Sequence, residues 1–197
     1  MMRSKRPLLA ERPTVGQLET ELAREKYRRR YGRVMRSTIY TLITVAAVAV
    51  LVATLWLPVL QIYGSSMSPT LDEGEIVVSL KGSDFRQGDI VAFYYNNKIL
   101  VKRVIAGPGR WVDIGEDGTV CVDGEPLNEP YLTEKAFGDC DIQLPYQVPD
   151  GRYFVMGDHR STSVDSRHSA VGCVASEQIV GKIVFRVWPL KAMGGLS

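Results

Sequence analysis

Two separate segments of this chain carry residue types that could catalyse acyl transfer. The first is the hydroxyl-rich run 63–70, which reads YGSSMSPT and contains Ser66. The second is Lys102, in the middle of the apolar run 99–106. A neutral lysine amine can take the proton of a serine hydroxyl and turn it into a nucleophile. Small residues beside a proline are also typical of a simple turn, so the first run by itself does not indicate a site.

Lys102 is the more unusual of the two features. In a strand its side chain shares a face with Leu100 and Val104, whereas Arg103 points to the other face. A lysine among aliphatic neighbours commonly extends its amine to water or marks an edge strand. A buried amine would behave differently, because desolvation lowers its pKa from about 10.4 by several units. The residues around Lys102 leave both interpretations open.

A third segment, 157–167, reads GDHRSTSVDSR and follows a predicted strand. Its density of hydroxyl and charged side chains is too specific for a simple connection. With this segment included, the chain resembles the bacterial type I signal peptidases, and the resemblance covers residues 37 to about 188. One such motif would be a weak signal, whereas four in the family's order are a specific one. The matching motifs are 64–70, 88–91, 101–104 and 157–167.

The resemblance implies a role for each matching residue. Ser66 would be the acylated nucleophile and Lys102 its general base, with the backbone N–H of Ser66 as oxyanion donor. Ser163 would orient the lysine amine through a hydrogen bond. Two ion pairs with a structural role are also implied, Asp158 with Arg103 and Asp165 with Arg167.

The resemblance also implies the substrates, which are secretory preproteins cut after small residues in an Ala-x-Ala pattern. A preprotein would lie extended and pair with exposed strand edges. Shallow apolar pockets near Ile62, Tyr63 and Val101 would admit only small side chains. The reaction needs no cofactor.

Two residues depart from the best-known pattern of the family. Some relatives have a serine in place of Gly64 and use its hydroxyl as a second oxyanion donor, so a backbone group or a water molecule must replace it here. His159 stands where an asparagine is common, and microsomal relatives use a histidine in place of the lysine. Because Lys102 occupies the lysine position itself, we interpret His159 and His168 as surface loop residues.

The motifs lie in a part of the chain that is rich in β patterns. Short β-branched and apolar runs alternate with Gly, Pro, Asn and Asp turns. This predicts a mainly β fold with an antiparallel, barrel-like catalytic domain rather than βαβ units. Residues 125–150 are proline-rich and are expected to form a long irregular excursion. The predicted strands are 75–80, 89–95, 99–106, 110–114, 119–124, 152–158 and 179–189.

A long apolar segment precedes this domain. Arg36 and Asp72 have no charged residue between them, and residues 39–60 are almost continuously apolar. As a helix these residues would be about 33 Å long, enough to cross about 30 Å of hydrocarbon. A cleavable signal peptide would have a shorter apolar core nearer the terminus, and a buried core helix would carry a polar stripe. We therefore expect one retained transmembrane helix.

Charge is distributed unevenly about this segment. Residues 1–36 hold 11 Lys or Arg against 4 Asp or Glu, whereas residues 37–197 hold 13 against 18. Basic residues stay on the cytoplasmic side of a membrane. The expected order is a cytoplasmic segment (1–36), a transmembrane helix (37–60) and an extracytoplasmic catalytic domain (61–197). The expected partners are preproteins and the lipid bilayer, and nucleic acid is excluded because no helix-turn-helix accompanies residues 14–36.

The cysteines and histidines do not have the spacing of a metal site, so none is expected. Cys121, Cys140 and Cys173 lie in the predicted extracytoplasmic part, where disulfides are permitted, but their odd number leaves at least one thiol unpaired.

Three other functions share parts of this pattern. A self-cleaving repressor would have a Ser-Lys pair, with a DNA-binding module and an internal cleavage site in place of the membrane span. A membrane-anchored β module that binds envelope partners would use Lys102 only as an edge-strand charge. A specialised signal peptidase with few substrates would have the same features as a general one.

Overall fold

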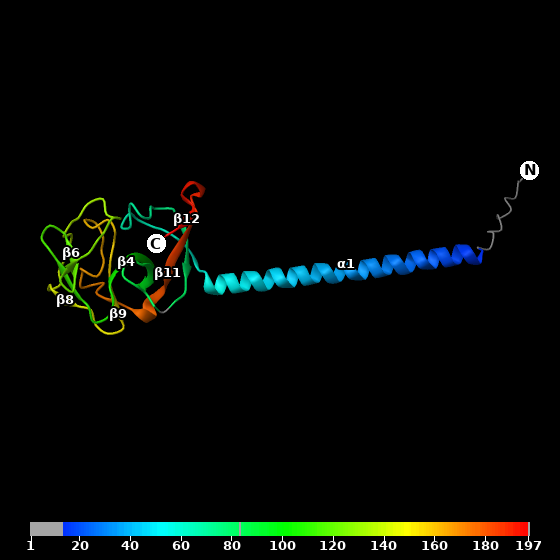
Figure 1. The fold of residues 1–197 in the computed structure, drawn as a ribbon, viewed down its shortest axis with the longest axis horizontal. Coiled ribbons are helices and arrows are strands. Elements are labelled where there is room, and N and C mark those ends of the chain that lie inside the picture. Colours follow the sequence, from blue (N-terminus) through cyan, green and yellow to red (C-terminus); the bar gives the residue numbers. More distant parts are fainter. Residues whose placement is uncertain (1–13, 83, 197) are drawn as a thin grey trace, which may run out of the picture. The chain divides into compact units, whose positions relative to one another are not determined.

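The computed structural model describes residues 14–82 and 84–196, so the predictions for residues 1–13 lie outside the described residues. The chain divides into two compact units, with the division between Leu51 and Val52. The first unit holds most of helix α1 (Val15–Trp56), and the second holds all of the described strands (Figure 1). The predicted order of one long helix followed by a mainly β domain is confirmed.

Helix α1 is exposed along its whole length. At its start, the Thr14 backbone N–H donates to Gln17 Oε1 at 2.9 Å, as in a capping box. An 18-residue window of the helix has a mean hydropathy of 2.2, and none of it is buried. Among the described residues this is the one helix long and apolar enough to cross a membrane, judged by length and composition. Because such a surface is unfavourable in water, the helix fits a membrane anchor.

Helix α1 ends about one turn before the apolar run does. It stops at Trp56, whereas the sequence predicts a membrane helix over 37–60. Pro58 explains the difference, because proline lacks the N–H that a helix needs and disfavours helical dihedral angles in the preceding residue. The chain continues as strand β1 (Val59–Gln61). The apolar part of the helix, residues 39–56, is therefore about 27 Å long.

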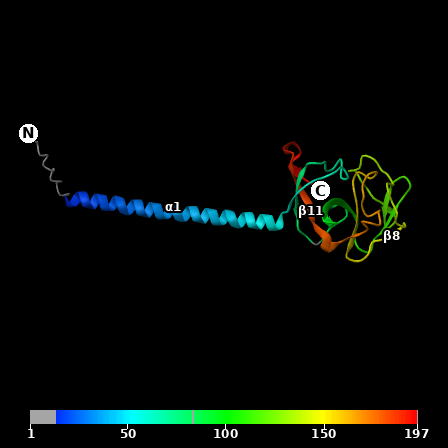
Figure 2. The ribbon, with the colours of Figure 1, turned by 180° about the vertical axis from the view of Figure 1, so that it is seen from behind.

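The described strands form two antiparallel sheets. The larger has 8 strands in the order β1-β2-β11-β3-β4-β9-β10, with β12 paired to β11, and the smaller has 4 in the order β7-β6-β5-β8. Neither sheet closes into a barrel within the described residues, and Figures 1 and 2 show the small sheet and β11 at opposite ends of the domain. The larger sheet contains β2 (Ile76–Leu80), β3 (Ile90–Tyr95), β4 (Lys98–Ala106), β9 (Arg152–Met156), β10 (Val174–Ala175), β11 (Ile179–Trp188) and β12 (Gly194–Gly195), and the smaller contains β5 (Trp111–Ile114), β6 (Val120–Val122), β7 (Glu125–Pro126) and β8 (Tyr146–Gln147).

All seven predicted strands are present, with ends that differ by up to about two residues, which is the usual uncertainty of such boundaries. The strands that the sequence did not indicate are β1, β7, β8, β10 and β12, and each has two or three residues. Runs of that length are too short for an alternating pattern to be recognised. The excursion 125–150 is irregular apart from β7 and β8. It is followed directly by the turn that leads into β9.

Strand β4 is only partly enclosed in the larger sheet. Strand β3 pairs with it from Lys98 to Arg103, whereas β9 pairs with it only from Arg103 to Ala106. Residues 98–102 therefore have no neighbouring strand on their second side within the described part of the chain. Unpaired backbone groups on such an edge are available to an extended peptide.

Candidate active site

The structure brings Ser66 and Lys102 into direct contact. The Lys102 Nζ donates a hydrogen bond to Ser66 Oγ at 2.6 Å. Lys102 is only 3% exposed, whereas Ser66 is half-buried. The amine therefore meets the hydroxyl at a point that is shielded from water on the lysine side. This is the geometry that a general base for a serine nucleophile requires.

Apolar packing explains why Ser66 lies where it does. Met67 and Leu71 are buried in a core cluster together with Ile62 and residues of β2, β3 and β11. Leu71 N donates to the Met67 carbonyl at 2.9 Å, which closes the turn that holds the serine. The Ser66 carbonyl oxygen accepts a hydrogen bond from the His159 backbone N–H at 3.1 Å. Side chains thus anchor the nucleophile segment to the core, and the backbone anchors it to the 157–167 loop.

Burial also determines the protonation of Lys102. Loss of water around the amine lowers its pKa from 10.5 to about 8. The Asp165 and Asp158 carboxylates act in the opposite direction and raise it, while the Arg167 guanidinium lowers it. An amine with this pKa has a neutral fraction near neutral pH, and the neutral form can accept the Ser66 proton.

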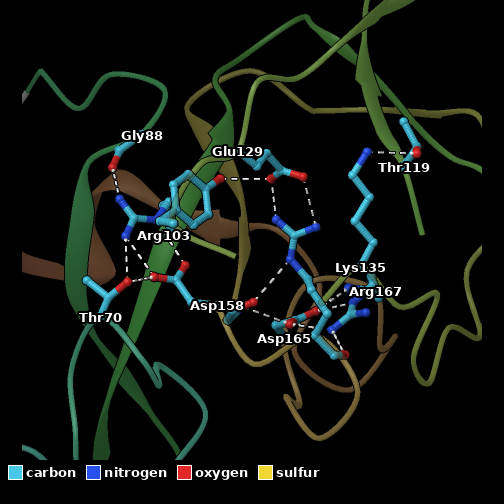
Figure 3. A network of polar contacts seen from close by, with 12 residues as sticks. Thr70, Gly88, Arg103, Thr119, Glu129, Lys135, Asp158, Asp165 and Arg167 are labelled. Atoms are coloured by element: carbon cyan, nitrogen blue, oxygen red, sulfur yellow. Dashed lines mark hydrogen bonds and ion pairs between the residues drawn. The ribbon is translucent and has the colours of Figure 1, made fainter. Parts of the chain in front are cut away.

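The predicted pair of Arg103 and Asp158 is present and buried. Arg103 Nε donates to Asp158 Oδ1 at 2.9 Å and Nη2 donates to Oδ2 at 2.7 Å (Figure 3). The side chains are 3% and 1% exposed. Arg103 also donates to the Gly88 carbonyl at 2.8 Å, and Thr70 Oγ1 donates to Asp158 Oδ2 at 2.5 Å. Arg103 Nη2 also donates to Thr70 Oγ1 at 3.3 Å, so this guanidinium joins its own motif to the three other motifs recognised in the sequence.

The predicted pair of Asp165 and Arg167 is also present, and both side chains are fully buried. Arg167 Nε and Nη2 each donate to the Asp165 carboxylate at 2.9 Å. The same carboxylate accepts the Gly157 backbone N–H at 3.0 Å. Arg167 Nη2 also donates to the Arg160 carbonyl at 2.9 Å. This pair holds the two ends of the 157–167 loop together.

Ser163 lies beside Gly157, the residue that packs against the Ser66 carbonyl oxygen. Its Oγ is buried and has no hydrogen-bond partner among the described residues. A Cβ on Gly157 would overlap Ser163 Oγ and lie 2.5 Å from the Ser66 carbonyl oxygen, so only glycine allows these segments to approach so closely. A hydrogen bond from Ser163 that orients the Lys102 amine stays a prediction.

A pocket of about 760 Å³ opens beside Ser66. One wall is residues 59–64 with Ser66 and Met67, and the other is residues 98–101 on the free edge of β4. The three residues predicted to form small-residue pockets, Ile62, Tyr63 and Val101, all line it. An extended chain in this pocket would lie between two strand edges with one end at the Ser66 hydroxyl.

Comparison with known proteins decides the family. A family model described as signal peptidase, peptidase S26, matches residues 35–188 of this chain. The chain belongs to the S26 family of signal peptidases. Signal peptidase IB of Staphylococcus aureus (strain COL) is 39% identical over 148 residues, which cover 65% of this chain and 76% of that protein. Signal peptidase I of Bacillus caldolyticus is 40% identical over 159 residues, which cover 71% of this chain and 86% of that protein.

A solved structure of a signal peptidase I from Enterococcus faecalis is 30% identical to this S26 chain, with a TM-score of 0.44. It matches 50% of this chain and 96% of that chain.

Membership in the S26 family separates the functions that the sequence left open. The matched region begins at residue 35 and so includes the apolar segment, where a self-cleaving repressor would have a DNA-binding module. An S26 signal peptidase is a serine endopeptidase, which excludes a purely binding module. A general and a specialised signal peptidase remain alternatives, because both belong to this family.

The two histidines of this S26 chain have different environments. His168 is partly exposed and lies 3.5 Å from Asp141, at the surface as expected. His159 is half-buried, and its Nδ1 is buried without a hydrogen-bond partner in the described part of the chain. Its backbone, rather than its ring, reaches Ser66. The position after Asp158 thus supports Ser66 through an N–H that any residue other than proline would supply.

Glu129 is a site residue that sequence reasoning missed. It forms a buried ion pair with Arg160, and both side chains are 1% exposed. The signal for it was a charge imbalance: the 101–104 and 157–167 motifs contain three arginines, all buried in the structure, but only Asp158 and Asp165 as partners. Asp89 of the 88–91 motif pairs with Lys182 instead. A buried guanidinium without a carboxylate is costly, so a third acidic residue was required. Its position in the irregular excursion could not be read from the sequence.

The three cysteines are unpaired in the structure, which describes each of them. Cys173 is buried, and burial raises the pKa of its thiol to about 11, so it stays protonated.

Proposed function

We propose that this signal peptidase removes N-terminal signal peptides from secretory preproteins, with Ser66 as the acylated nucleophile and Lys102 as the general base. The observation that carries the proposal is the 2.6 Å contact between Lys102 Nζ and Ser66 Oγ, with the amine almost excluded from water. Ser-Lys pairs are a variant of the serine protease triad in which the lysine replaces the histidine.

The reaction follows from this geometry. Neutral Lys102 takes the Ser66 proton as Oγ attacks the scissile carbonyl, and the Ser66 backbone N–H stabilises the negative charge that develops on the carbonyl oxygen. The lysine then gives its proton to the leaving amine, which leaves an acyl-enzyme on Ser66. A water molecule, deprotonated by the same amine, hydrolyses the ester and releases the signal peptide.

The pocket supports small residues at the cleavage site. Ile62 is buried and Val101 is half-buried, so the pocket walls next to Ser66 are apolar. Both side chains also pack in the core, so they cannot move aside for a bulky substrate side chain. The substrate backbone would pair with the free edge of residues 98–101, and its alternate side chains would point into the pocket. We infer that these two side chains are the alanines of an Ala-x-Ala pattern.

Cleavage of a preprotein by the full chain in detergent tests this function. The expected product has a new N-terminus directly after an Ala-x-Ala sequence, as determined by N-terminal sequencing. A bulky residue in place of either alanine should prevent the cut. If the preprotein stays intact, or if the bulky variant is cut equally well, the proposal fails.

The activity is expected to depend on pH through Lys102. Because the amine must be neutral to accept a proton, kcat/KM should fall about tenfold for each pH unit below the pKa of about 8 and level off above it. The measurement is kcat/KM for an Ala-x-Ala peptide from pH 6 to 10, with tryptophan fluorescence to verify the fold at each pH. A flat profile would contradict the assignment of Lys102 as base.

We propose a membrane topology from helix α1 and the charges around it. Residues 1–36 would lie in the cytoplasm, helix α1 from residue 37 to Trp56 would provide the membrane span, and the catalytic domain, which begins with β1 at Val59, would be extracytoplasmic. The basic residues before the span support this orientation. Protease added to intact spheroplasts is expected to degrade the catalytic domain, while an epitope at the N-terminus is degraded only after lysis. If the catalytic domain is protected from the protease in intact spheroplasts, the proposed orientation is wrong.

A further inference from the structure

A segment of the irregular excursion, residues 129–138, contacts the buried ion pairs near the Ser66–Lys102 pair. Two of its residues, Glu129 and Lys135, are labelled in Figure 3. We call this segment the strap. It contacts the three buried arginines of the site, namely Arg103 through Tyr131, Arg160 through Glu129, and Arg167 through the Phe137 carbonyl. These contacts are separate from the pocket and from the nucleophile segment.

Glu129 makes the ion pair among these three contacts, and both side chains are 1% exposed. Both of its carboxylate oxygens accept from the Arg160 guanidinium, with Nη1 to Oε2 at 3.1 Å. Arg160 Nε in turn donates to the Gly157 carbonyl at 3.2 Å. Gly157 packs directly against the Ser66 carbonyl oxygen, an approach that is possible because glycine has no Cβ. Glu129 is therefore linked to the nucleophile through one guanidinium and one glycine.

Tyr131 links the strap to the other member of the pair. Its hydroxyl donates to Glu129 Oε1 at 2.8 Å, and its ring lies 3.9 Å from the Arg103 guanidinium carbon. Burial raises the pKa of Tyr131 well above its usual value, so the hydroxyl keeps its proton and remains a donor. Arg103 directly follows Lys102 in β4. The strap thus holds residues next to both reacting groups.

The far end of the strap fits closely against the same loop. The Phe137 carbonyl accepts from Arg167 Nη1 at 2.7 Å. Gly138 has a φ of +67°, and a Cβ there would overlap Arg167 Nη1 and lie 2.6 Å from the Arg160 carbonyl oxygen. Only glycine combines this dihedral angle with so close an approach. The strap is therefore fitted to the loop at both of its ends.

We propose that the strap positions the Ser66–Lys102 pair and that Glu129 is the positioning residue on which it depends. Buried ion pairs add little net stability compared with apolar residues of similar size, whereas they specify one arrangement of the groups they join. Here the Arg103–Asp158 pair includes the residue after Lys102. The Arg160–Glu129 pair reaches Ser66 through Gly157. The inference rests on the proposed catalytic roles of Ser66 and Lys102.

Glu129→Gln in the full chain in detergent tests this inference. Misplacement of a reacting group by about 1 Å can reduce a rate about 10²-fold, so we expect kcat for an Ala-x-Ala peptide to fall by about that factor while KM changes less than about threefold. A loosened loop also admits water to the Lys102 amine. The midpoint of the kcat/KM profile is therefore expected to move above 8, toward the ordinary lysine value.

Two control variants distinguish positioning from a general loss of stability. Lys135 belongs to the strap, but it is exposed and its hydrogen bond goes to Thr119 Oγ1 at 3.1 Å, away from the buried arginines, so Lys135→Ala should keep the wild-type kcat and midpoint. Val122 is buried in the small sheet, and Val122→Ala should lower the melting temperature without moving the pH midpoint. A milder strap variant, Tyr131→Leu, removes the ring from Arg103 and should lower kcat about threefold to tenfold.

The outcomes separate this inference from the proposed function. If the wild type does not cut the peptide, the proposed function fails. If the wild type cuts it and folded Glu129→Gln has the wild-type kcat and pH midpoint, only the strap inference is overturned. If Glu129→Gln does not fold, Tyr131→Leu decides, and the same wild-type values in that variant overturn the inference. The strap inference is also overturned if Val122→Ala lowers kcat and moves the pH midpoint as Glu129→Gln does, because a general loss of stability would then explain both effects.

Discussion

Lys102→Ala is expected to lower kcat for signal-peptide cleavage by at least about 10³-fold, and Ser66→Ala by at least as much. Without the amine, the Ser66 hydroxyl loses the base that would take its proton, which is the Lys102 Nζ at 2.6 Å from Oγ. Without the hydroxyl, no acyl-enzyme can form. Both variants should still bind substrate, because the pocket walls are unchanged, so KM should change little.

The double variant gives the sharper test of a pair that acts as one unit. Residues that share one step are strongly non-additive, so Ser66→Ala combined with Lys102→Ala should be no slower than either single variant. Lys191→Ala is the matched control, because Lys191 is an exposed lysine in the short helix η2 (Leu190–Ala192) and should retain full activity. Additional loss in the double variant, or wild-type turnover in Lys102→Ala, would show that the two groups do not act together.

Asp165→Ala is expected to lower the free energy of unfolding of the β domain by about 3–5 kcal/mol. Both side chains of the Asp165–Arg167 pair are fully buried, so removal of the carboxylate leaves a guanidinium charge with no counterion in a site without water. The Gly157 N–H also loses its acceptor. Urea denaturation followed by tryptophan fluorescence measures the change.

An exposed ion pair provides the comparison for Asp165. Arg110 and Asp123 are 56% and 38% exposed, and pairs in water contribute at most about 1 kcal/mol. Arg110→Ala should therefore change the free energy of unfolding by less than that amount. Equal effects of Asp165→Ala and Arg110→Ala would mean that the loop relaxes and hydrates the Arg167 charge, and the account of the buried pairs would then be wrong.

Much of the fold was predictable because its strands carry strong local patterns. Residues 90–95 and 98–106 are rich in β-branched and aromatic residues and are bounded by the Asn96-Asn97 turn, where both asparagines have a positive φ. Strand β1 was not predictable, because Val59 and Leu60 continue the apolar run of the preceding helix. Their strand conformation depends on pairing with Val77 and Val78 of β2, which the sequence does not reveal.

The residues of the candidate site likewise include some that the sequence predicted and some that it did not. The resemblance of the motifs to the signal peptidases implied Ser66 with Lys102 and the two pairs Arg103–Asp158 and Asp165–Arg167, and the structure brings the members of each set together. Glu129 did not follow, because it is 31 positions from its partner and stands in a segment without periodicity. The expected contact of Ser163 could not be settled by residue type either, since a hydroxyl rotates to whichever neighbour the packing provides.

The sequence by itself determined what kinds of groups this protein carries and in what order: an apolar span, a serine in a hydroxyl-rich segment, a lysine in an apolar strand and a charged loop. Such features are local, because hydropathy, turn residues and motif spacing act over a few neighbouring positions. Only the tertiary structure decided that the lysine amine is dry, that it lies against the serine, and that Glu129 neutralises the third arginine. Those properties are sums over contacts between distant segments, and desolvation and charge pairing exist only once the segments have packed.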